Sequence, residues 1–237
     1  MTAPISGFPA LGSKAPAFYA ITTNGTINFP EDFKGKWVIL FSHPADFTPV
    51  CTTEIATFAA MQEDFKALNT ELIGLSVDSN SSHLAWLKEI EEKISFHNYN
   101  GQKINFPLIA DNKGDIAALY GMLRPELGDT KTCRSVFFID PDSTIRAMIH
   151  YPATTGRNFA EIRRVIEALQ TTDAYGVSTP ADWQPGDDVL LSAPQTHQQV
   201  HEREQKMPDM QCSDWFFCTQ KYENLKDKTN RKTTFSR

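Results

Sequence analysis

The stretch Trp37-Val-Ile-Leu-Phe-Ser-His-Pro-Ala-Asp-Phe-Thr-Pro-Val-Cys51 joins a continuous apolar run to a short polar loop. The run at residues 37–41 is apolar at every position, which is typical of a strand buried on both faces of a sheet. Beyond the loop, apolar side chains recur at spacings near 3.6 residues and predict a helix from about Thr52 to Leu68. The stretch therefore predicts a central strand that leads through a proline-bearing loop into an amphipathic helix.

Strands and helices alternate outward from this stretch. Asn24-Gly25 suits a two-residue turn with positive φ and predicts a hairpin at residues 18–29. A helix is predicted around residues 84–94, with Ser81 or Ser82 as its N-terminal cap. The remaining expected strands lie at 72–77, 106–110, 136–139 and 145–151, and the remaining helices at 116–122 and from Asn158. This order predicts an α/β fold in which helices cover one sheet.

Composition excludes several classes of protein. The chain has 237 residues, of which 41% are hydrophobic, so it is long enough to bury a full core. Its 23 Lys and Arg against 29 Asp and Glu give a net charge of −6, which argues against the basic surface of a nucleic-acid binder. No apolar run approaches the ~20 residues of a membrane span, and the N-terminus lacks the layout of a secretory signal. We therefore expect a cytoplasmic protein without nucleic-acid or membrane partners.

The composition and the hydrophobic periodicity of the sequence change after Thr171. Proline, glycine and tryptophan then interrupt a stretch with little periodicity. We expect three parts: a domain at residues 1–171, an extended arm at 172–220 that packs on something else, and a basic tail at 221–237. The tail carries six basic and two acidic residues, and we expect it to be a flexible, solvated end.

Cys51 lies where the loop meets the helix, in the first helical turn. Unpaired backbone N–H groups and the positive end of the helix dipole meet there, and both favour a thiolate over a thiol. The thiolate is the nucleophilic form of cysteine, so this position suits a reactive sulfur. The alternative is a small buried residue near a helix start.

Two neighbours favour the reactive alternative. Thr48 places a hydroxyl three residues before the sulfur, where it can bond both the thiolate and an oxygen that the thiolate attacks. Pro44 has no N–H, so it forms a suitable wall against a reactive sulfur, and it stiffens the loop together with Pro49.

Four segments carry a resemblance to a known family. Residues 42–54, Ser-His-Pro-Ala-Asp-Phe-Thr-Pro-Val-Cys-Thr-Thr-Glu, resemble the active-site segment of the peroxiredoxins, and specifically of their one-cysteine-type subfamily. Residues 132–140, 151–158 and 181–186 are similar to later landmarks of the family and of that subfamily. The resemblance implies a thioredoxin-like fold, with the arm after about residue 172 serving in dimer formation.

The resemblance also implies roles for single residues. Cys51 corresponds to the peroxidatic cysteine, which attacks a peroxide oxygen and becomes a sulfenic acid. Thr48 would orient the peroxide, and Pro44 would screen the sulfenate. Arg134 corresponds to the arginine that lies against the thiolate, where a guanidinium donates charge-assisted hydrogen bonds to the peroxide. Without the resemblance, Arg134 would be read as a surface charge at a strand end.

Three further residues belong to the implied site. Glu54 and Arg157 correspond to a supporting ion pair of the family. His43 precedes the loop proline, and its ring either lines the substrate pocket or packs in the core.

The remaining cysteines distinguish this chain from true one-cysteine enzymes. Cys212 and Cys218 flank an aromatic cluster, as in archaeal-type members of the subfamily that carry a late C-x5-C pair. In those relatives the second cysteine resolves the sulfenate, so the resemblance implies that Cys218 of a partner subunit does so here, with Cys212 as the alternate. The implied assembly is a homodimer or a decamer of five dimers. Cys133 falls on the strand face opposite Arg134, and we expect a buried, inert thiol there.

A zinc site in the arm is the alternative explanation of the late cysteines. His197 and His201 precede Cys212 and Cys218 and complete a set of four possible ligands. The C-x5-C spacing is wider than in the usual zinc knuckle, and only a helical arm would align the two histidines. We therefore expect no metal.

The expected function is that of a thiol peroxidase, which reduces hydrogen peroxide and organic hydroperoxides in antioxidant defence. The sulfur is the redox centre, so no metal, haem, flavin or other cofactor is expected. A dithiol reductant such as a thioredoxin-like protein would regenerate the enzyme. The alternative is a thioredoxin-fold holdase or signalling partner that senses peroxide without fast turnover.

Overall fold

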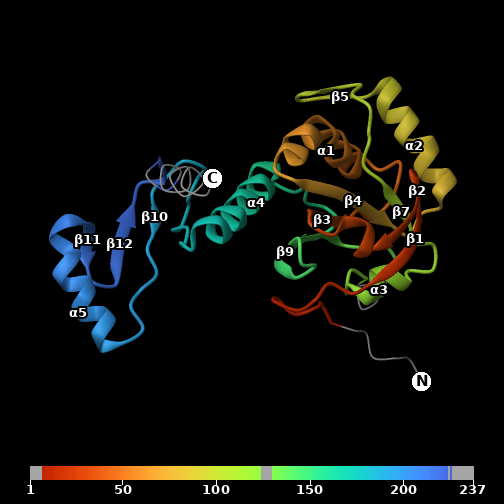
Figure 1. Cartoon of the computed structure of the whole chain (residues 1–237). Helices are drawn as coiled ribbons and strands as arrows, with labels where there is room; N and C mark the ends of the chain where they lie inside the picture. Colours follow the sequence, from red (N-terminus) through yellow and green to blue (C-terminus); the bar gives the residue numbers. More distant parts are fainter. Residues whose placement is uncertain (1–6, 124–129, 224, 226–237) are drawn as a thin grey trace, which may run out of the picture. The chain divides into compact units, whose positions relative to one another are not determined.

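The computed structural model describes residues 7–123, 130–223 and 225 (Figure 1). The chain divides into two compact units, Met1–Phe159 and Ala160–Arg237. The first unit holds a seven-stranded sheet with its helices, and the described part of the second holds a small three-stranded sheet, two α-helices and a short 3-10 helix. No helix within the described ranges is long and apolar enough to cross a membrane.

The sheet of the first unit has the strand order β2-β1-β7-β4-β3-β8-β9. Its central strand β3 (Trp37–Ser42) pairs parallel with β4 (Thr70–Ser76) and antiparallel with β8 (Arg134–Ile139). Every residue of β3 and of β8 is buried, as in strands covered on both faces. The other strands are β1 (Phe18–Thr22), β2 (Gly25–Phe29), β7 (Leu108–Ala110) and β9 (Ile145–Tyr151), with β5 (Ser95–Phe96) and β6 (Tyr99–Asn100) forming a separate hairpin.

Side-chain alternation along β3 assigns the helices to two faces of the sheet. The helices are α1 (Pro49–Ala67), α2 (Asn80–Lys93) and α3 (Asp115–Leu119), with a short 3-10 helix at Glu31–Phe33. The ring of Phe41 stacks on Phe58 of α1 with 4.0 Å between centroids. α2 lies on the same side (Figure 1), where Trp86 Nε1 donates to Thr52 Oγ1 at 3.2 Å. α3 shares a core cluster with Val38 on the opposite face, so the predicted α/β fold is confirmed.

Three predicted helix boundaries differ from the structure, and one of them is the end of α3, which lies at Leu119 rather than at residue 122. α1 begins at Pro49 rather than near Thr52, because proline fits the first helical position, where no backbone N–H bond is needed. α2 is capped by Ser79, whose Oγ accepts a hydrogen bond from the Ser82 amide at 3.2 Å, so neither Ser81 nor Ser82 is the cap. Both helices therefore extend further toward their N-termini than the apolar pattern predicts.

The second unit contains regular elements that the sequence does not predict. They are α5 (His197–Lys206), a 3-10 helix at Met207–Asp209, and the strands β10 (Val189–Leu190), β11 (Gln211–Asp214) and β12 (Phe217–Gln220). The unit also holds most of α4 (Phe159–Tyr175), the helix that the sequence predicts from Asn158. The small sheet has the order β10-β12-β11. α5 has no buried residue, so its sequence carries no apolar stripe from which a helix could be predicted.

The first residues of the expected tail pack into this unit instead of fraying. Tyr222 and Leu225 contribute to a small core with Val177 and Val189. The rest of the expected flexible tail lies outside the described residues. The boundaries expected after residues 171 and 220 stay predictions, while the two compact units divide after residue 159.

Gly74 on β4 shows how tightly the sheet packs against its helices. A Cβ there would lie 2.3 Å from Leu108 Cδ2 and 2.9 Å from Phe41 Cζ, and both of these neighbours are fully buried. We expect Gly74→Ala to lower the free energy of unfolding by about 1–3 kcal/mol through overpacking. Gly156→Ala is the matched control, because its Cβ would meet Val50 at an ordinary 3.6 Å. Urea unfolding measures both variants, and equal stabilities would contradict the expectation.

Candidate active site

Cys51 occupies the first turn of α1, a few residues after β3 ends. Its side chain is fully buried and its thiol is free. Its Sγ accepts a hydrogen bond from Arg134 Nη1 at 3.3 Å. The positive end of a helix dipole and a guanidinium therefore meet at one sulfur, and both stabilise the anionic form of a cysteine.

Arg134 begins β8 and is held from several sides. Its Nη1 also donates to Glu54 Oε2 at 2.7 Å, while Nε and Nη2 donate to the Ala153 carbonyl at 3.0 and 2.6 Å. The residue is only 2% exposed, so it is not a surface charge at a strand end. These partners fix the planar guanidinium in one orientation toward the sulfur.

Glu54 and Arg157 form a bidentate ion pair beneath this contact. Arg157 Nε donates to Glu54 Oε1 at 2.9 Å and Nη2 donates to Oε2 at 2.7 Å, and the Arg157 amide adds a third bond of 2.9 Å. Arg157 Nη1 donates to the carbonyls of Ser42 and Ser135, each at 3.0 Å. The pair thus connects α1 to the ends of both β3 and β8.

The electrostatics of Glu54 follow from this arrangement. Burial raises the pKa of its carboxyl, but the charges and hydrogen bonds of Arg157, with the charge of Arg134, outweigh burial and lower it below its usual range. The carboxylate is therefore ionised at neutral pH and can hold both guanidiniums.

The structure places Thr48 and Pro44 in the loop between β3 and α1. Thr48 is the N-cap residue of α1, and its Oγ1 donates to the Ala45 carbonyl at 2.8 Å. Pro44 is buried. Neither makes a hydrogen bond to Cys51 among the described residues, so their predicted roles toward a peroxide stay predictions.

His43 belongs to a buried cluster that sequence reasoning missed. Its Nε2 lies 2.9 Å from Asp46 Oδ1, and His83 Nδ1 lies 2.8 Å from Asp46 Oδ2. Burial lowers the pKa of His43, against the raising effect of its bond to Asp46. Burial raises the pKa of Asp46, but the hydrogen bonds from both imidazoles hold it well below its usual range. Asp46 stands in the loop motif, whereas nothing in the sequence around His83 signals its place here.

Known proteins match this chain over the segments that carry the site. Residues 11–148 match the model of the AhpC/TSA family, and residues 168–206 match that of the C-terminal domain of 1-Cys peroxiredoxin. A peroxiredoxin of Methanosarcina mazei is 55% identical over 214 residues, which cover 90% of this chain and 98% of the relative. The chain belongs to the peroxiredoxin family.

More distant peroxiredoxins also match this chain over most of its length. That of Archaeoglobus fulgidus is 45% identical over 219 residues, covering 90% of this chain and 99% of the relative. A solved yeast mitochondrial 1-Cys peroxiredoxin has a TM-score of 0.78 at 41% identity, covering 90% of this chain and all of that one. A mutant of peroxiredoxin 6 of Arenicola marina has a TM-score of 0.77 at 36% identity, covering 90% and 98%. The predicted family and its thioredoxin-like fold with a C-terminal domain are confirmed.

Family membership decides between the two functions that the sequence left open. A peroxiredoxin is a thiol-dependent peroxidase with an antioxidant role, so the chain is an enzyme rather than a sensor without turnover. Its reagents are a peroxide and a thiol reductant, as is typical of the family.

The remaining cysteines of this peroxiredoxin lie in different surroundings. Cys212 and Cys218 form a disulfide with each other across β11 and β12, where they are register partners. Cys218 is 1% exposed and Cys212 is half-buried. A link between Cys218 and Cys51 of a partner subunit needs a second chain and stays a prediction. Cys133 is free and half-buried, with its Sγ 3.1 Å from Ser135 Oγ.

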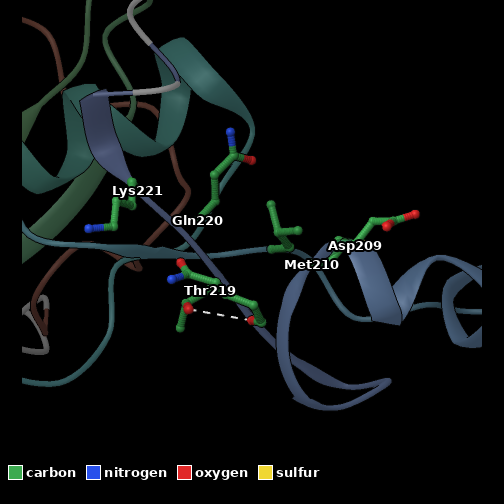
Figure 2. Close-up of a pocket in the computed structure, with 7 residues that line it drawn as sticks. Asp209, Met210, Thr219, Gln220 and Lys221 are labelled. Carbon is green, nitrogen blue, oxygen red and sulfur yellow. Dashed lines mark hydrogen bonds between the residues drawn. The ribbon is translucent and has the colours of Figure 1, made fainter.

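An open groove of about 460 Å³ is lined by residues of β11 and β12, the strands that carry the disulfide (Figure 2). Two of its lining residues, Gln211 and Thr219, are the sequence neighbours of Cys212 and Cys218, and Thr219 Oγ1 donates to the Gln211 carbonyl at 3.4 Å. The other lining residues are Leu191, Asp209, Met210, Gln220 and Lys221. The groove therefore lies along the two strands that carry the Cys212–Cys218 pair.

The four residues considered for zinc do not gather in the described part of the chain. His197 and His201 lie on α5, which buries no residue, and His201 Nε2 is 2.9 Å from Gln205 Nε2. Within the described ranges, the one group of three or more potential metal ligands is the cluster of His43, Asp46 and His83.

The contact between Arg134 and Cys51 predicts a large kinetic effect. Arg134→Ala should slow the reaction of reduced Cys51 with hydrogen peroxide by on the order of 10- to 1000-fold, because it removes a charge-assisted donor from the developing charge. Single-turnover stopped-flow kinetics measures this rate. Arg146→Ala is the control. Arg146 pairs with Asp140 at 3.4 Å rather than with Cys51, so this substitution should leave the rate unchanged. A normal rate in Arg134→Ala would make the arginine structural.

The depressed pKa of Glu54 predicts how stability depends on acid. Because the folded pKa lies below the unfolded value, the contribution of Glu54 is complete above the unfolded value and is lost as pH falls through the folded one. Glu54→Gln should cost about 3–5 kcal/mol at pH 7, by leaving buried guanidiniums without a counter-charge.

Urea unfolding at several pH values tests how the contribution of Glu54 to stability depends on pH. Between about pH 5 and about pH 3 the stability of Glu54→Gln should fall less steeply than that of the unaltered protein. Glu161→Gln is the control, since its partly exposed pair with Arg164 should contribute only about 1 kcal/mol. Identical slopes for Glu54→Gln and the unaltered chain would contradict the assignment.

Proposed function

We propose that this peroxiredoxin reduces hydrogen peroxide and small organic hydroperoxides through a sulfenic acid at Cys51, which Cys218 of a partner subunit resolves. The 3.3 Å contact of Arg134 Nη1 with Cys51 Sγ carries the first step. The thiolate attacks one peroxide oxygen: an S–O bond forms, the O–O bond breaks, and the leaving oxygen takes a proton to become water or an alcohol. Arg134 stabilises the negative charge as it moves from sulfur to that oxygen.

Three loop residues complete the proposed substrate site. Thr48 Oγ1, now bonded to the Ala45 carbonyl, can exchange this bond for one to a peroxide oxygen. Pro44 supplies a buried wall without an N–H that could compete for the sulfenate. The buried ring of His43 adjoins Pro44 and lines the same loop.

The second step joins the sulfurs of two subunits. A Cys218 thiolate attacks the sulfenic sulfur, so that an S–S bond forms and hydroxide leaves to become water. Cys212 is the register partner of Cys218, so its thiolate can then displace Cys51 and leave the Cys212–Cys218 disulfide. A dithiol reductant of thioredoxin-like chemistry returns that pair to thiols. The yeast relative is described as resolved via glutathione/thioredoxin systems, which supports such a reductant.

Exposed aromatic side chains support a second copy of the chain as the partner. Phe216 and Phe217 are 54% and 47% exposed, and Trp215 packs edge-on against Phe216 at 5.5 Å. Adjoining exposed rings of this kind mark interaction sites on soluble proteins. We propose that the arm docks on a second subunit, giving a homodimer or a decamer of five dimers. Regeneration by dithiols suits the cytoplasm.

Trapping the linked sulfurs tests the proposal. After one equivalent of hydrogen peroxide, Cys212→Ser should accumulate a disulfide-linked dimer on non-reducing gels, because no thiol remains to displace Cys51. Adding Cys51→Ser or Cys218→Ser to this variant should abolish the dimer, while adding Cys133→Ser should leave it.

Two outcomes would overturn the proposed resolution. If Cys212→Ser stayed monomeric but Cys218→Ser formed the linked dimer, the resolving role would pass to Cys212. If every variant stayed monomeric while Cys51 became oxidised, the resolving thiol would come from outside the chain.

A further inference from the structure

The Cys212–Cys218 disulfide joins an edge strand to the middle strand of the small sheet. The strand order β10-β12-β11 makes β11 an edge, and no further strand pairs with it among the described residues. Gln211, Ser213 and Asp214 of β11 are exposed, and Cys212 between them is half-buried. Cys218 lies on β12, with a strand on either side, and is only 1% exposed. The two sulfurs of one disulfide therefore differ in how easily a second protein can reach them.

The backbone of Cys212 faces the open edge of the sheet. In an antiparallel strand, the N–H and the C=O of one residue point to the same side. The Cys218 carbonyl accepts a hydrogen bond from the Leu191 amide at 3.0 Å, so the backbone groups of Cys218 face away from β11. Cys212 and Cys218 are therefore a non-hydrogen-bonded register pair, which agrees with their Cα separation of 4.0 Å. The N–H and C=O of Cys212 consequently point away from β12, where a strand added from another chain can bond them.

The surroundings of Cys218 suit the sulfur that leaves in a thiol–disulfide exchange. The rate of such an exchange depends on which sulfur an attacking thiolate can reach, and Cys218 presents almost no surface. Apolar burial disfavours a thiolate at Cys218, so a sulfur released there takes up a proton. The thiol then has an acceptor in place, because Cys218 Sγ lies 3.6 Å from the Asp214 carbonyl oxygen.

The open groove along β11 and β12 extends the surface that a partner can use (Figure 2). Gln211 and Thr219, the sequence neighbours of the two cysteines, line it. Met210 adds apolar surface, while Asp209 and Lys221 add one charge of each sign. A surface with free backbone groups, apolar contact and both charges suits a folded protein better than a small thiol.

We propose that a dithiol protein docks an extended segment along the open edge of β11 and attacks the sulfur of Cys212, with Cys218 as the leaving thiol. A bond forms between the first sulfur of the reductant and Cys212 Sγ, the Cys212–Cys218 bond breaks, and Cys218 takes a proton. The second thiol of the reductant then attacks the first, which closes the disulfide of the reductant and releases Cys212 as a thiol. Two electrons pass from the reductant to this chain.

The proposal rests on the proposed cycle, in which this disulfide is the product that the reductant removes. Its test does not depend on the earlier steps of that cycle. Full-length Cys51→Ser, oxidised with diamide to the Cys212–Cys218 disulfide, cannot react with peroxide at residue 51. A failure of the resolving step between subunits therefore leaves the outcome of this test unchanged.

Trapping the first exchange identifies the sulfur that is attacked. The probe is a thioredoxin whose second active-site cysteine is replaced by serine, so that the mixed disulfide persists. The probe and the oxidised Cys51→Ser protein are mixed, quenched in acid within the first turnover, and alkylated. Peptide mass spectrometry should find the probe on Cys212 in about 10-fold or greater excess over Cys218. A probe attached mainly to Cys218 would overturn the proposal, as would no adduct under conditions in which dithiothreitol reduces the same disulfide.

Hydrogen exchange in the trapped complex tests the docking edge. The amides of β11 should exchange roughly 10-fold more slowly in the complex than in the oxidised protein alone, because the Cys212 N–H gains a partner. Strand β2 is the matched control, since it is also an edge strand but carries no cysteine, and its exchange should stay the same. Unchanged exchange in β11, or equal slowing in β11 and β2, would overturn docking along this edge.

Discussion

The bidentate pair between Glu54 and Arg157 determines the geometry of everything around Cys51. One buried carboxylate accepts hydrogen bonds from two guanidiniums and a backbone amide. Arg157 also bonds the carbonyls of Ser42 and Ser135, so α1, β3 and β8 meet at this network. Removing any one member would leave a charge buried without its partner, which is far more costly than losing a surface pair. The position of Arg134, and with it the proposed activation of the sulfur, depends on that carboxylate.

Charge balance then links this network to the chemistry. Arg134 and Arg157 carry two positive charges, and Glu54 supplies one negative charge among residues that are at most 6% exposed. With a neutral thiol at Cys51, one positive charge stays buried without compensation. A negative charge on the Cys51 sulfur would complete the balance, because the sulfur lies 3.3 Å from Arg134 Nη1. The packing that stabilises the fold and the chemistry that the peroxidase needs therefore favour the same ionic state.

The sequence predicts those features of the structure that depend on neighbouring residues, and it does not predict those that depend on residues far apart in the chain. The strand at 37–41 and the helix after Cys51 are predicted correctly, because hydrophobic periodicity is a property of neighbouring residues. Arg134, Glu54 and Arg157 were expected only through resemblance, since nothing in single-chain spacing places residues 80 to 103 positions apart beside one another. His83 has no local signal at all, because a histidine in a first helical turn has many ordinary explanations. α5 and its neighbouring strands escape prediction because they bury too little apolar surface to produce a pattern.

Burial of both sulfurs limits how the proposed cycle can run. Cys51 is 0% exposed and Cys218 is 1% exposed, so neither sulfur can reach the other while its element stays closed. The first turn of α1 is the part of the helix with the fewest internal hydrogen bonds, and the β11–β12 pair is short and borders an open groove. Local opening at these two places costs less than opening the central sheet. In the proposed cycle, the network that activates Cys51 therefore also delays its resolution, because the same contacts hold the first turn closed. During that delay the proposed sulfenic acid would stay within reach of a second peroxide, which would oxidise it to sulfinic acid. Fast attack and exposure to overoxidation thus have one structural cause.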